Sequence, residues 1–335
     1  MRFGIGLLAA LLLIGCSGGD KTTDETNGSA AAGTTTGGAA PSGDKPLVAF
    51  SQANSRDPWR KVFDAETKAM ADKHKDEISF EMQDANGDAA KQNGIIDTFM
   101  VKSPKVLLVS PTETSVQSSI EKAFDAGVQV ILLDRAIESD KYTALIGGDN
   151  VEIGRQAAKY VGDRLKGKGT VLMIQGIAQA TPTKDRKGGF LEVMKKDYPG
   201  IKVIEGDDCG YDRQKARSYM ETFLQKGEKI DCVYAHNDEM AIGARLAWDA
   251  ANPSGGTAPV FVGIDGCQQE VVDMIKSGKL DATFKYPTPG AAGVELALKL
   301  IKGEKPSEKK IILPTEIVTK DTADAYVTAN PNLAK

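Results

Sequence analysis

A regular alternation of short apolar runs with longer segments of helical period constrains the fold of this 335-residue chain more than any other feature. The first apolar runs are LVAFSQ (47–52), ISFEMQDA (78–85), VLLVSP (106–111) and VQVILLD (128–134). Each has the length of a strand, and the segments between them, at 58–74, 88–101 and 115–126, are long enough for helices. This βαβ pattern predicts parallel strands covered by helices.

The same pattern starts again after Asn150 and continues to residue 265. Its predicted helices are 151–165, 184–196, 212–225 and 238–250, and its predicted strands are 170–176, 201–207, 231–237 and 259–265. About 290 residues follow the first 44, which is comfortable for two lobes of about 140 residues each. We therefore expect an α/β fold with two Rossmann-like lobes, each built on a doubly wound parallel sheet.

The N-terminus has the three-part layout of a secretory signal. Arg2 supplies one positive charge, residues 5–14 are apolar, and Gly15 precedes Cys16. The apolar run is too short to span a bilayer of about 30 Å. The Gly-Cys ending resembles a bacterial lipobox, so we expect residues 1–16 to be a signal peptide in which Cys16 becomes the lipidated first residue of the mature protein. An ordinary signal peptide with an incidental cysteine is the alternative.

Residues 17–45 form a predicted flexible tether. They are almost wholly Ser, Gly, Thr, Ala and Asp, with no large apolar side chain to bury. A coil of this composition and length has a root-mean-square span of about 30 Å. We expect the folded part of the chain to be held to a membrane by Cys16 and to move freely above it.

Composition argues against several classes of function. A net charge of −4 does not suggest the clustered basic face that a nucleic-acid partner requires. Apart from Cys16 there are three cysteines, Cys209, Cys232 and Cys267, and none of them has CxxC spacing. They imply neither a zinc site nor a full disulfide framework. Whether Cys209 and Cys232 form a disulfide is left open. Two histidines are too few for a histidine-rich metal site, and the motifs GxxxxGK[ST] and GxGxxG do not occur. We expect no metal and no cofactor.

Polar residues stand where the predicted strands end. They are Ser51-Gln52, Asp84, Ser110, Asp134-Arg135, Gln175, Asn237-Asp238 and Asp265. Open α/β sheets bind their ligands in the crevice outside the carboxyl ends of the strands, so these positions are candidates for a binding site. Helix capping or turn formation is the alternative for each of them taken singly.

Carboxylates, guanidinium groups and amides together suit a sugar. Vicinal hydroxyls both donate and accept hydrogen bonds, and planar polar groups bind them in pairs. Trp59, at the start of a predicted helix and next to Arg60, is the candidate for stacking on the sugar ring, unless it anchors that helix in the core. A structural ion pair is the alternative for Asp134-Arg135, and a solvated surface charge is the alternative for Arg186.

Five motifs occur in the order and spacing of periplasmic sugar-binding proteins. They are SQANSRDPWR, LLDRAI, DRKGGF, YAHNDEMAIGA and VGIDG. The chain resembles the ribose-binding-protein family, the type I periplasmic binding proteins, from residue 47 to about 327. The WR pair, the LLDR strand end and YAHND are most similar to the galactofuranose-binding members that serve sugar ABC importers.

This resemblance implies two lobes joined by three hinge strands that close on one sugar. The crossings between lobes are expected near residues 148–150, 265–266 and 286–289. The first lobe would then contain residues 46–148 and 266–287, and the second lobe residues 149–265 and 288–327.

The resemblance also implies roles for individual residues. It places Trp59 and Arg60 in the first lobe as ring-stacking and hydroxyl-binding residues, with Asp134 and Arg135 across the sugar from them. The residues that bind the sugar from the second lobe and the hinge would be Arg186, Asn237 and Asp265. Gln52 is also assigned to the sugar site, but its match to the family pattern is weaker. The sequence departs from the family pattern around Lys285-Tyr286 and around residues 177–182, which leaves the identity of the sugar open.

The predicted function is that of a lipid-anchored, monomeric binding subunit. It would capture a monosaccharide, galactofuranose or a similar hexose, and present it to an ABC permease. A ligand-binding subunit for a chemoreceptor or sensor kinase is the alternative. Asp134 and Asp265 could in principle act as general acid and general base. Each already has an expected role in binding, so we expect no enzymatic activity.

Overall fold

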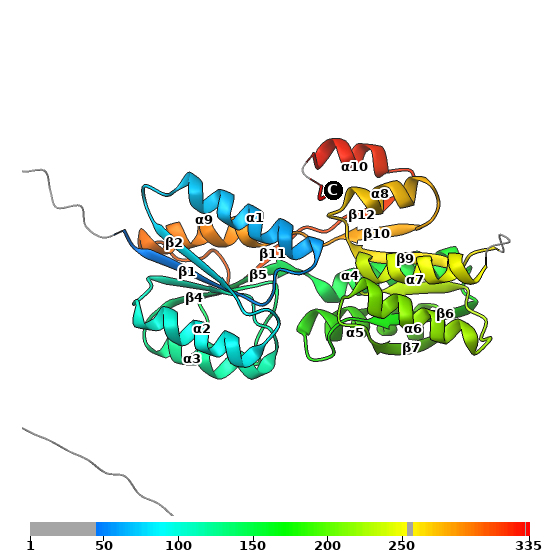
Figure 1. Cartoon of the computed structure of the whole chain (residues 1–335), viewed down its shortest axis with the longest axis horizontal. Coiled ribbons are helices and arrows are strands. Elements are labelled where there is room, and N and C mark those ends of the chain that lie inside the picture. The colour runs from blue at the N-terminus through cyan, green and yellow to red at the C-terminus, as the bar shows by residue number, and fades with distance from the viewer. Residues whose placement is uncertain (1–44, 253–256, 332) are drawn as a thin grey trace, which may run out of the picture. The chain divides into compact units, whose positions relative to one another are not determined.

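The computed structural model describes residues 45–252, 257–331 and 333–335. The predicted signal peptide with Cys16, and the predicted tether up to residue 44, lie outside these residues. Within the described residues the chain forms two six-stranded sheets, each with its own helices, which we call the first and the second lobe (Figure 1). This confirms the predicted α/β class with two lobes.

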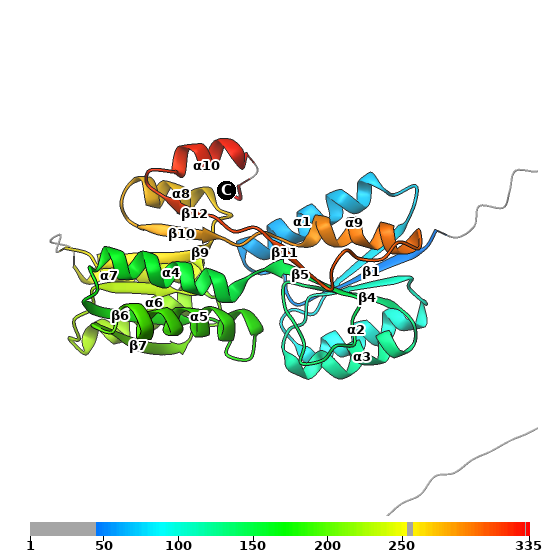
Figure 2. The same cartoon turned by 180° about the vertical axis from the view of Figure 1, so that it is seen from behind.

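The first lobe contains a parallel sheet of strand order β11-β5-β4-β3-β1-β2. Its strands are β1 (Leu47–Gln52), β2 (Ser79–Asp84), β3 (Val106–Val109), β4 (Gln129–Leu133), β5 (Ala144–Gly148) and β11 (Lys310–Leu313). Its helices are α1 (Pro58–Lys73), α2 (Ala89–Val101), the 3₁₀ turn η1 (Thr114–Val116), α3 (Gln117–Asp125) and α9 (Gly290–Ile301). Helices α1 and α9 pack together on one face, and α2 and α3 cover the other (Figures 1 and 2). The central strands β3 and β4 are almost wholly apolar because both faces of the sheet are covered.

The second lobe repeats this plan with strand order β12-β10-β9-β8-β6-β7, and only the β10–β12 pair is antiparallel. Its strands are β6 (Gly169–Gln175), β7 (Ile201–Asp208), β8 (Cys232–Ala235), β9 (Val260–Asp265), β10 (Ala282–Lys285) and β12 (Ile317–Thr319). Its helices are α4 (Asn150–Arg164), α5 (Thr181–Asp197), α6 (Arg213–Gln225), α7 (Asp238–Ala251), α8 (Gln269–Lys276) and α10 (Ala323–Ala329). Cys209 and Cys232 are both free thiols, so the pairing that the sequence left open is not formed.

The chain crosses between the lobes three times. The first crossing joins β5 to α4 at residues 148–150, the second joins β10 to α9 at residues 286–289, and the third joins β11 to β12 at residues 314–316. Strand β10 precedes the second crossing and strand β11 precedes the third, so these two strands belong to different sheets.

The predicted crossing at residues 265–266 is wrong, and so is the assignment of the segments that depended on it. Strand β10 pairs in parallel with β9, with Ala282 opposite Val262, so residues 266–287 stay in the second lobe. Helix α9 packs on α1, and β11 pairs with β5, with Lys310 opposite Leu145, so these elements of the predicted segment 288–327 lie in the first lobe. Only β12 and α10 of that segment lie in the second. An apolar run can pair with the free edge of either sheet, and its own periodicity does not distinguish the two edges.

Helices α4 and α5 approach each other through two glycines. A β-carbon at Gly154 would lie 2.3 Å from the carbonyl oxygen of Arg186, and one at Gly189 would lie 2.1 Å from that of Val151. Both distances are far shorter than any van der Waals contact, so only glycine permits this packing. The contact fixes the turn of α5 that carries Arg186.

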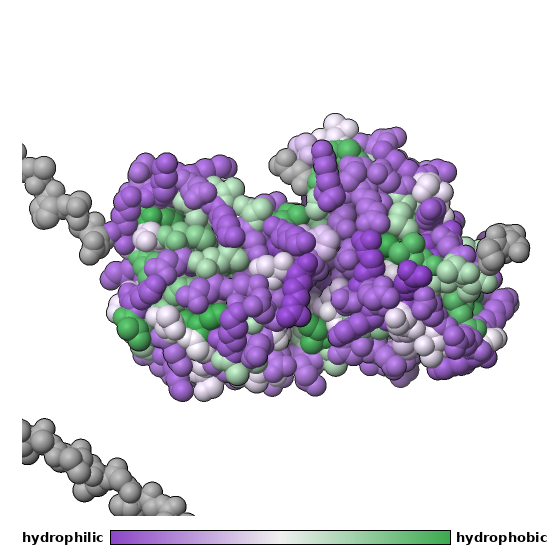
Figure 3. Space-filling view, viewed as in Figure 1, coloured by the Kyte–Doolittle hydropathy of each residue, from purple (hydrophilic) through white to green (hydrophobic). Residues whose placement is uncertain are grey.

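The surface of the described residues carries few large apolar side chains. The exposed ones are Val101, Leu246 and Ile312, on three different elements. The face shown in Figure 3 is mainly hydrophilic, with apolar residues in small scattered groups. Single exposed apolar residues are normal on a protein surface. Among the described residues we find no helix with the length and apolar character that a membrane span requires.

Replacing Gly154 with alanine should lower the free energy of unfolding by about 1–3 kcal/mol, because the new methyl group would push α4 away from α5. Urea denaturation measures this change. Gly188→Ala is the matched control, since Gly188 is on α5 but has no neighbour within 4 Å, and alanine there should leave stability unchanged or raise it by up to about 1 kcal/mol. Equal losses in both variants would contradict the close contact.

Candidate functional site

A cavity of about 290 Å³ lies between the carboxyl ends of the two sheets. This volume is at the small end of the range of about 300–1,000 Å³ that is usual for small-molecule sites. Seven of the eight residues predicted for the site line the cavity, namely Trp59, Arg60, Asp134, Arg135, Arg186, Asn237 and Asp265. Both lobes contribute charged groups to it.

Gln52 is the predicted residue that does not reach the cavity. It is fully buried, its Nε2 donates to Asp64 Oδ1 at 2.6 Å, and its Oε1 accepts from Arg60 Nη1 at 3.1 Å. Gln52 therefore orients Arg60 from behind and does not face the space where a ligand would lie.

A buried ion pair organises the first-lobe wall. Arg60 Nη2 lies 2.5 Å from Asp134 Oδ2, and Arg60 Nη1 donates to Ser110 Oγ at 2.8 Å. Arg135 lies on the other side of the same carboxylate, with its Nε 3.6 Å from Asp134 Oδ2. Burial by itself would raise the pKa of Asp134, but the positive charges of Arg60 and Arg135 outweigh it and hold that pKa below its usual value. Asp134 is therefore an ionised acceptor.

Two aspartates occupy corresponding places in the two sheets. Asp134 follows β4 and Asp265 ends β9, and each of these strands is third from the edge that β11 or β12 forms. Both residues have a positive φ, 71° for Asp134 and 131° for Asp265, which is strained for a residue with a side chain. Strain of this kind persists where the surrounding structure enforces it, most often at functional sites.

The second-lobe wall contains Arg186 and Asn237. Arg186 Nε donates to Asn150 Oδ1 at 2.8 Å, and its Nη1 donates to the carbonyl oxygen of His236 at 2.5 Å. Asn237 caps α7, since its Oδ1 accepts from the backbone N–H of Met240 at 3.0 Å. Asn237 thus both caps a helix and lines the cavity, so the two interpretations of this strand end are compatible.

The carboxyls of Asp265 and Asp238 resist ionisation. Asp265 is buried, and this burial raises its pKa well above the usual value, although Arg186 partly offsets the effect. Asp238 is fully buried behind it, with its Oδ2 accepting from the backbone N–H of Gly266 at 2.7 Å. Burial raises the pKa of Asp238 to about 7. A negative charge on either carboxyl also disfavours ionisation of the other.

The cavity is also lined by residues outside the predicted set, and among these Asp57, Tyr211 and Tyr286 contribute polar or aromatic groups. Asp57 caps α1 through its Oδ1, which accepts from the backbone N–H of Arg60 at 2.9 Å, and burial raises its pKa. The Asp-Pro pair that opens this helix is a local signal that could have identified it.

Tyr211 has a weaker signal in the sequence. Its hydroxyl lies 2.6 Å from Thr183 Oγ1, and its backbone has a φ of 62°. A β-carbon at Gly176 would lie 2.1 Å from the Tyr211 ring, so the ring fits only because residue 176 is glycine. An aromatic residue beside Gly210, just after a strand, is the only local hint of this role.

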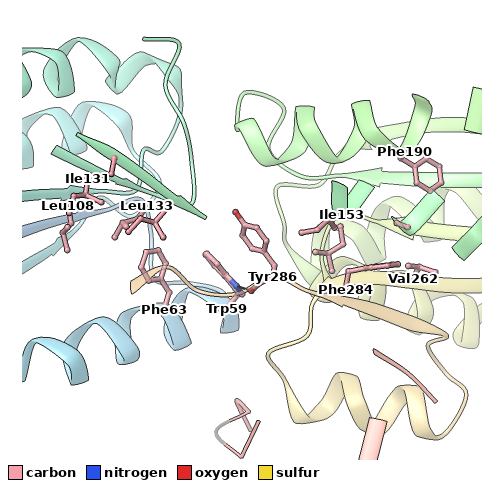
Figure 4. Packing of buried hydrophobic residues seen from close by; sticks show 14 of the residues in the cluster. Trp59, Phe63, Leu108, Ile131, Leu133, Ile153, Phe190, Val262, Phe284 and Tyr286 are labelled. Carbon is pink, nitrogen blue, oxygen red and sulfur yellow. Dashed lines mark hydrogen bonds between the residues drawn. The ribbon is translucent and has the colours of Figure 1, made fainter. Parts of the chain in front are cut away.

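Trp59 and Tyr286 lie side by side at the junction of the lobes (Figure 4). Their ring centroids are 5.2 Å apart with an interplanar angle of 28°, and Trp59 Nε1 donates to the carbonyl oxygen of Tyr286 at 2.6 Å. Trp59 also meets Phe63 edge to face and is only 5% exposed. Most of the Trp59 surface is thus packed against protein, although it borders the cavity.

Sequence and fold both match known proteins. A model of the periplasmic binding protein domain matches residues 48–305. The ribose import binding protein of Bacillus subtilis is 33% identical over 241 residues, covering 71% of this chain and 76% of that protein. The galactofuranose-binding protein of Escherichia coli is 30% identical over 299 residues, covering 86% and 90%. Among solved structures, the fructose-binding periplasmic domain of a hybrid two-component system has a TM-score of 0.80 at 34% identity, covering 85% and 94%.

The chain belongs to the periplasmic binding protein family. Its relatives are ribose-binding proteins and a galactofuranose-binding protein, which confirms the family predicted from the five motifs. These relatives are named as solute-binding proteins and not as enzymes.

Replacing Asp238 with asparagine should remove a pH dependence of stability. Because folding raises the pKa of Asp238 to about 7, from an ordinary value near 3.8, the folded protein holds a proton that the unfolded chain releases. Wild-type stability should therefore fall as pH rises from about 4 to 7, by at most about 1.4 kcal/mol per pH unit from this group. Asp238→Asn should gain in thermal midpoint over the wild type between pH 5 and pH 8. The control is Asp72→Asn, at an exposed position, whose thermal midpoint should differ from that of the wild type by the same amount at every pH. If the difference between Asp238→Asn and the wild type is also the same at every pH, the assignment is contradicted.

Proposed function

We propose that this protein is an extracytoplasmic binding protein that captures a monosaccharide between its two lobes and delivers it to an ABC permease. The observation that supports this most is the cavity, which brings carboxylates and guanidinium groups from both lobes around a small volume. Sugar hydroxyls both donate and accept, so such a mixture of acceptors and donors binds them well. Family membership supports the same class of function.

The groups available to a sugar differ between the walls. Asp265 lines the cavity and is 7% exposed, so its carboxyl can bind a ligand hydroxyl. The buried Nε of Arg135 has no hydrogen-bond acceptor among the described residues. A ligand hydroxyl near either atom would satisfy a polar group that is otherwise costly to bury.

Tyr211 supports an aromatic contact from the second lobe. Tyr211 is half-buried and lines the cavity, whereas Trp59 is almost wholly covered by neighbouring side chains. We therefore propose that Tyr211 presents its face to the apolar C–H side of the sugar, and that Trp59 contributes only an edge. Arg60, Asp134, Arg135, Arg186, Asn237 and Asp265 would bind the hydroxyls.

The names of several relatives support a sugar as the ligand. They are described as binding ribose, galactofuranose and fructose, whereas another relative is named a xylitol-binding protein. We propose galactofuranose or a similar hexose, as the WR, LLDR and YAHND motifs predict. Binding would favour the closed arrangement of the lobes, because the sugar contacts both at once.

A second candidate is a ligand-binding subunit for a sensor kinase or chemoreceptor. The similar fructose-binding domain belongs to a two-component system, and the same sugar cavity would serve that role equally well. In either role we propose a periplasmic or cell-surface protein, monomeric, anchored through lipidated Cys16 and the tether.

Thermal unfolding of the protein from Lys45 onward, with a panel of sugars, tests the proposed function. The panel is D-galactose, D-ribose, L-arabinose, D-fructose and D-glucose. A ligand at 100 times its dissociation constant should stabilise the folded state by about 2.7 kcal/mol, which raises the midpoint clearly. A selective rise, with the sugar recovered unaltered after long incubation, supports a binding protein. Conversion of the sugar would instead indicate an enzyme, and no rise with any sugar would contradict the sugar assignment.

Truncating Asp134 or Asn237 to alanine should weaken binding of the sugar by about 1–3 kcal/mol, roughly 5- to 150-fold in Kd, because ligand hydroxyls lose a buried partner. Isothermal titration measures the Kd of each variant. Asp97→Ala, at an exposed position on α2, is the control and should bind as the wild type does. Unchanged affinity in both site variants would place the sugar elsewhere.

A further inference from the structure

Tyr286 forms hydrogen bonds to both lobes from the segment that joins them. It lies in the crossing from β10 to α9 and is 3% exposed. Its hydroxyl donates to Asp134 Oδ1 at 2.8 Å and accepts from Asn150 Nδ2 at 3.2 Å. Asp134 belongs to the first lobe, and Asn150 is the first residue of α4 in the second. One hydroxyl therefore links the two lobes at the floor of the cavity.

These bonds extend to the arginines on the two walls. Asp134 Oδ2 accepts from Arg60 Nη2 at 2.5 Å, and Asn150 Oδ1 accepts from Arg186 Nε at 2.8 Å. A chain of hydrogen bonds thus runs from Arg60 through Asp134, Tyr286 and Asn150 to Arg186. It connects a cationic group of the first lobe with one of the second.

The chain has a single arrangement of donors and acceptors, in which both ends donate towards Asp134. Asp134 is ionised and only accepts, and burial keeps the pKa of Tyr286 well above its usual value, so the tyrosine proton points to Asp134. The amide of Asn150 must then donate to the Tyr286 oxygen, which turns its carbonyl oxygen towards Arg186. Every donor in the chain has an acceptor in this one arrangement.

The Tyr286 ring has little room to move. Trp59 stacks against it (Figure 4). The guanidinium carbon of Arg186 lies 4.6 Å from its centroid. A β-carbon at Gly148 would lie 2.6 Å from the ring, so the first crossing must have glycine there. Groups from both lobes and from the first crossing therefore hold the ring in one position.

We propose that Tyr286 is a positioning residue that couples the angle between the lobes to the arrangement of the charged groups in the cavity. A rotation of one lobe against the other changes the separation of Asp134 and Asn150, so the hydroxyl keeps both bonds only over a narrow range of angles. A ligand that binds Asp134 and Arg186 stabilises that range. This coupling rests on the proposed function for its ligand, but the link itself acts in the ligand-free protein as well.

Tyr286→Phe removes the link and keeps the ring. The variant is compared with its parent in a Trp248→Phe background, so that Trp59 is the one emitting tryptophan. Without sugar, small-angle X-ray scattering should give a larger radius of gyration for the Phe variant, and Trp59 emission should shift to the red as the stack loosens. With the panel sugar that raises the thermal midpoint most, closure should require about tenfold more sugar.

Two further variants separate coupling from a structural role. Tyr160→Phe is the matched control, because the Tyr160 hydroxyl donates to the carbonyl oxygen of Asp281 within the second lobe, and it should change neither scattering nor emission. Asn150→Ala should reproduce the effects of Tyr286→Phe, and the double variant should add little to either. If Tyr286→Phe lowers only the thermal midpoint, or if the two effects simply add, the proposal is overturned. If no sugar binds, the proposed function fails, and the ligand-free measurements still test Tyr286.

Discussion

The buried ion pair between Arg60 and Asp134 is the interaction around which the site is built. Both side chains are less than 5% exposed, and removing such charges from water costs several kcal/mol for each ion unless hydrogen bonds replace the lost hydration. Gln52 and Ser110 bind the guanidinium group, and Tyr286 binds the carboxylate. The first-lobe wall is therefore organised before any ligand arrives.

The second-lobe wall is organised differently. Arg186 binds neutral acceptors, Asn150 and the backbone of His236, and the nearby carboxyls of Asp265 and Asp238 resist ionisation. Its cation is thus less fully compensated than Arg60. A ligand hydroxyl that accepts from Arg186 and donates to Asp265 would complete this wall. The two walls thus differ in how fully their buried cations are compensated.

The sequence predicted much of the lining of this cavity because strand ends are local features. Asp134, Asn237 and Asp265 directly follow apolar runs, and parallel strands bring their carboxyl ends to one edge of a sheet. Arg186 and Trp59 were predicted from motifs at the starts of helices. Gln52 shows the limit of this reasoning, since it also ends an apolar run but points behind the wall to Asp64 and Arg60. The direction of a side chain at a strand end depends on neighbours that are distant in sequence.

The amino-acid sequence by itself determined the two α/β lobes, since hydrophobic periodicity and strand length are properties of short segments. The tertiary structure decided which sheet the last strands joined, because β10 and β11 each met a free edge that their own residues do not specify. It also decided that Trp59 is mostly covered and that Tyr286 links the lobes. Those contacts join residues more than 130 positions apart, and only the packed crossings bring them within hydrogen-bond distance.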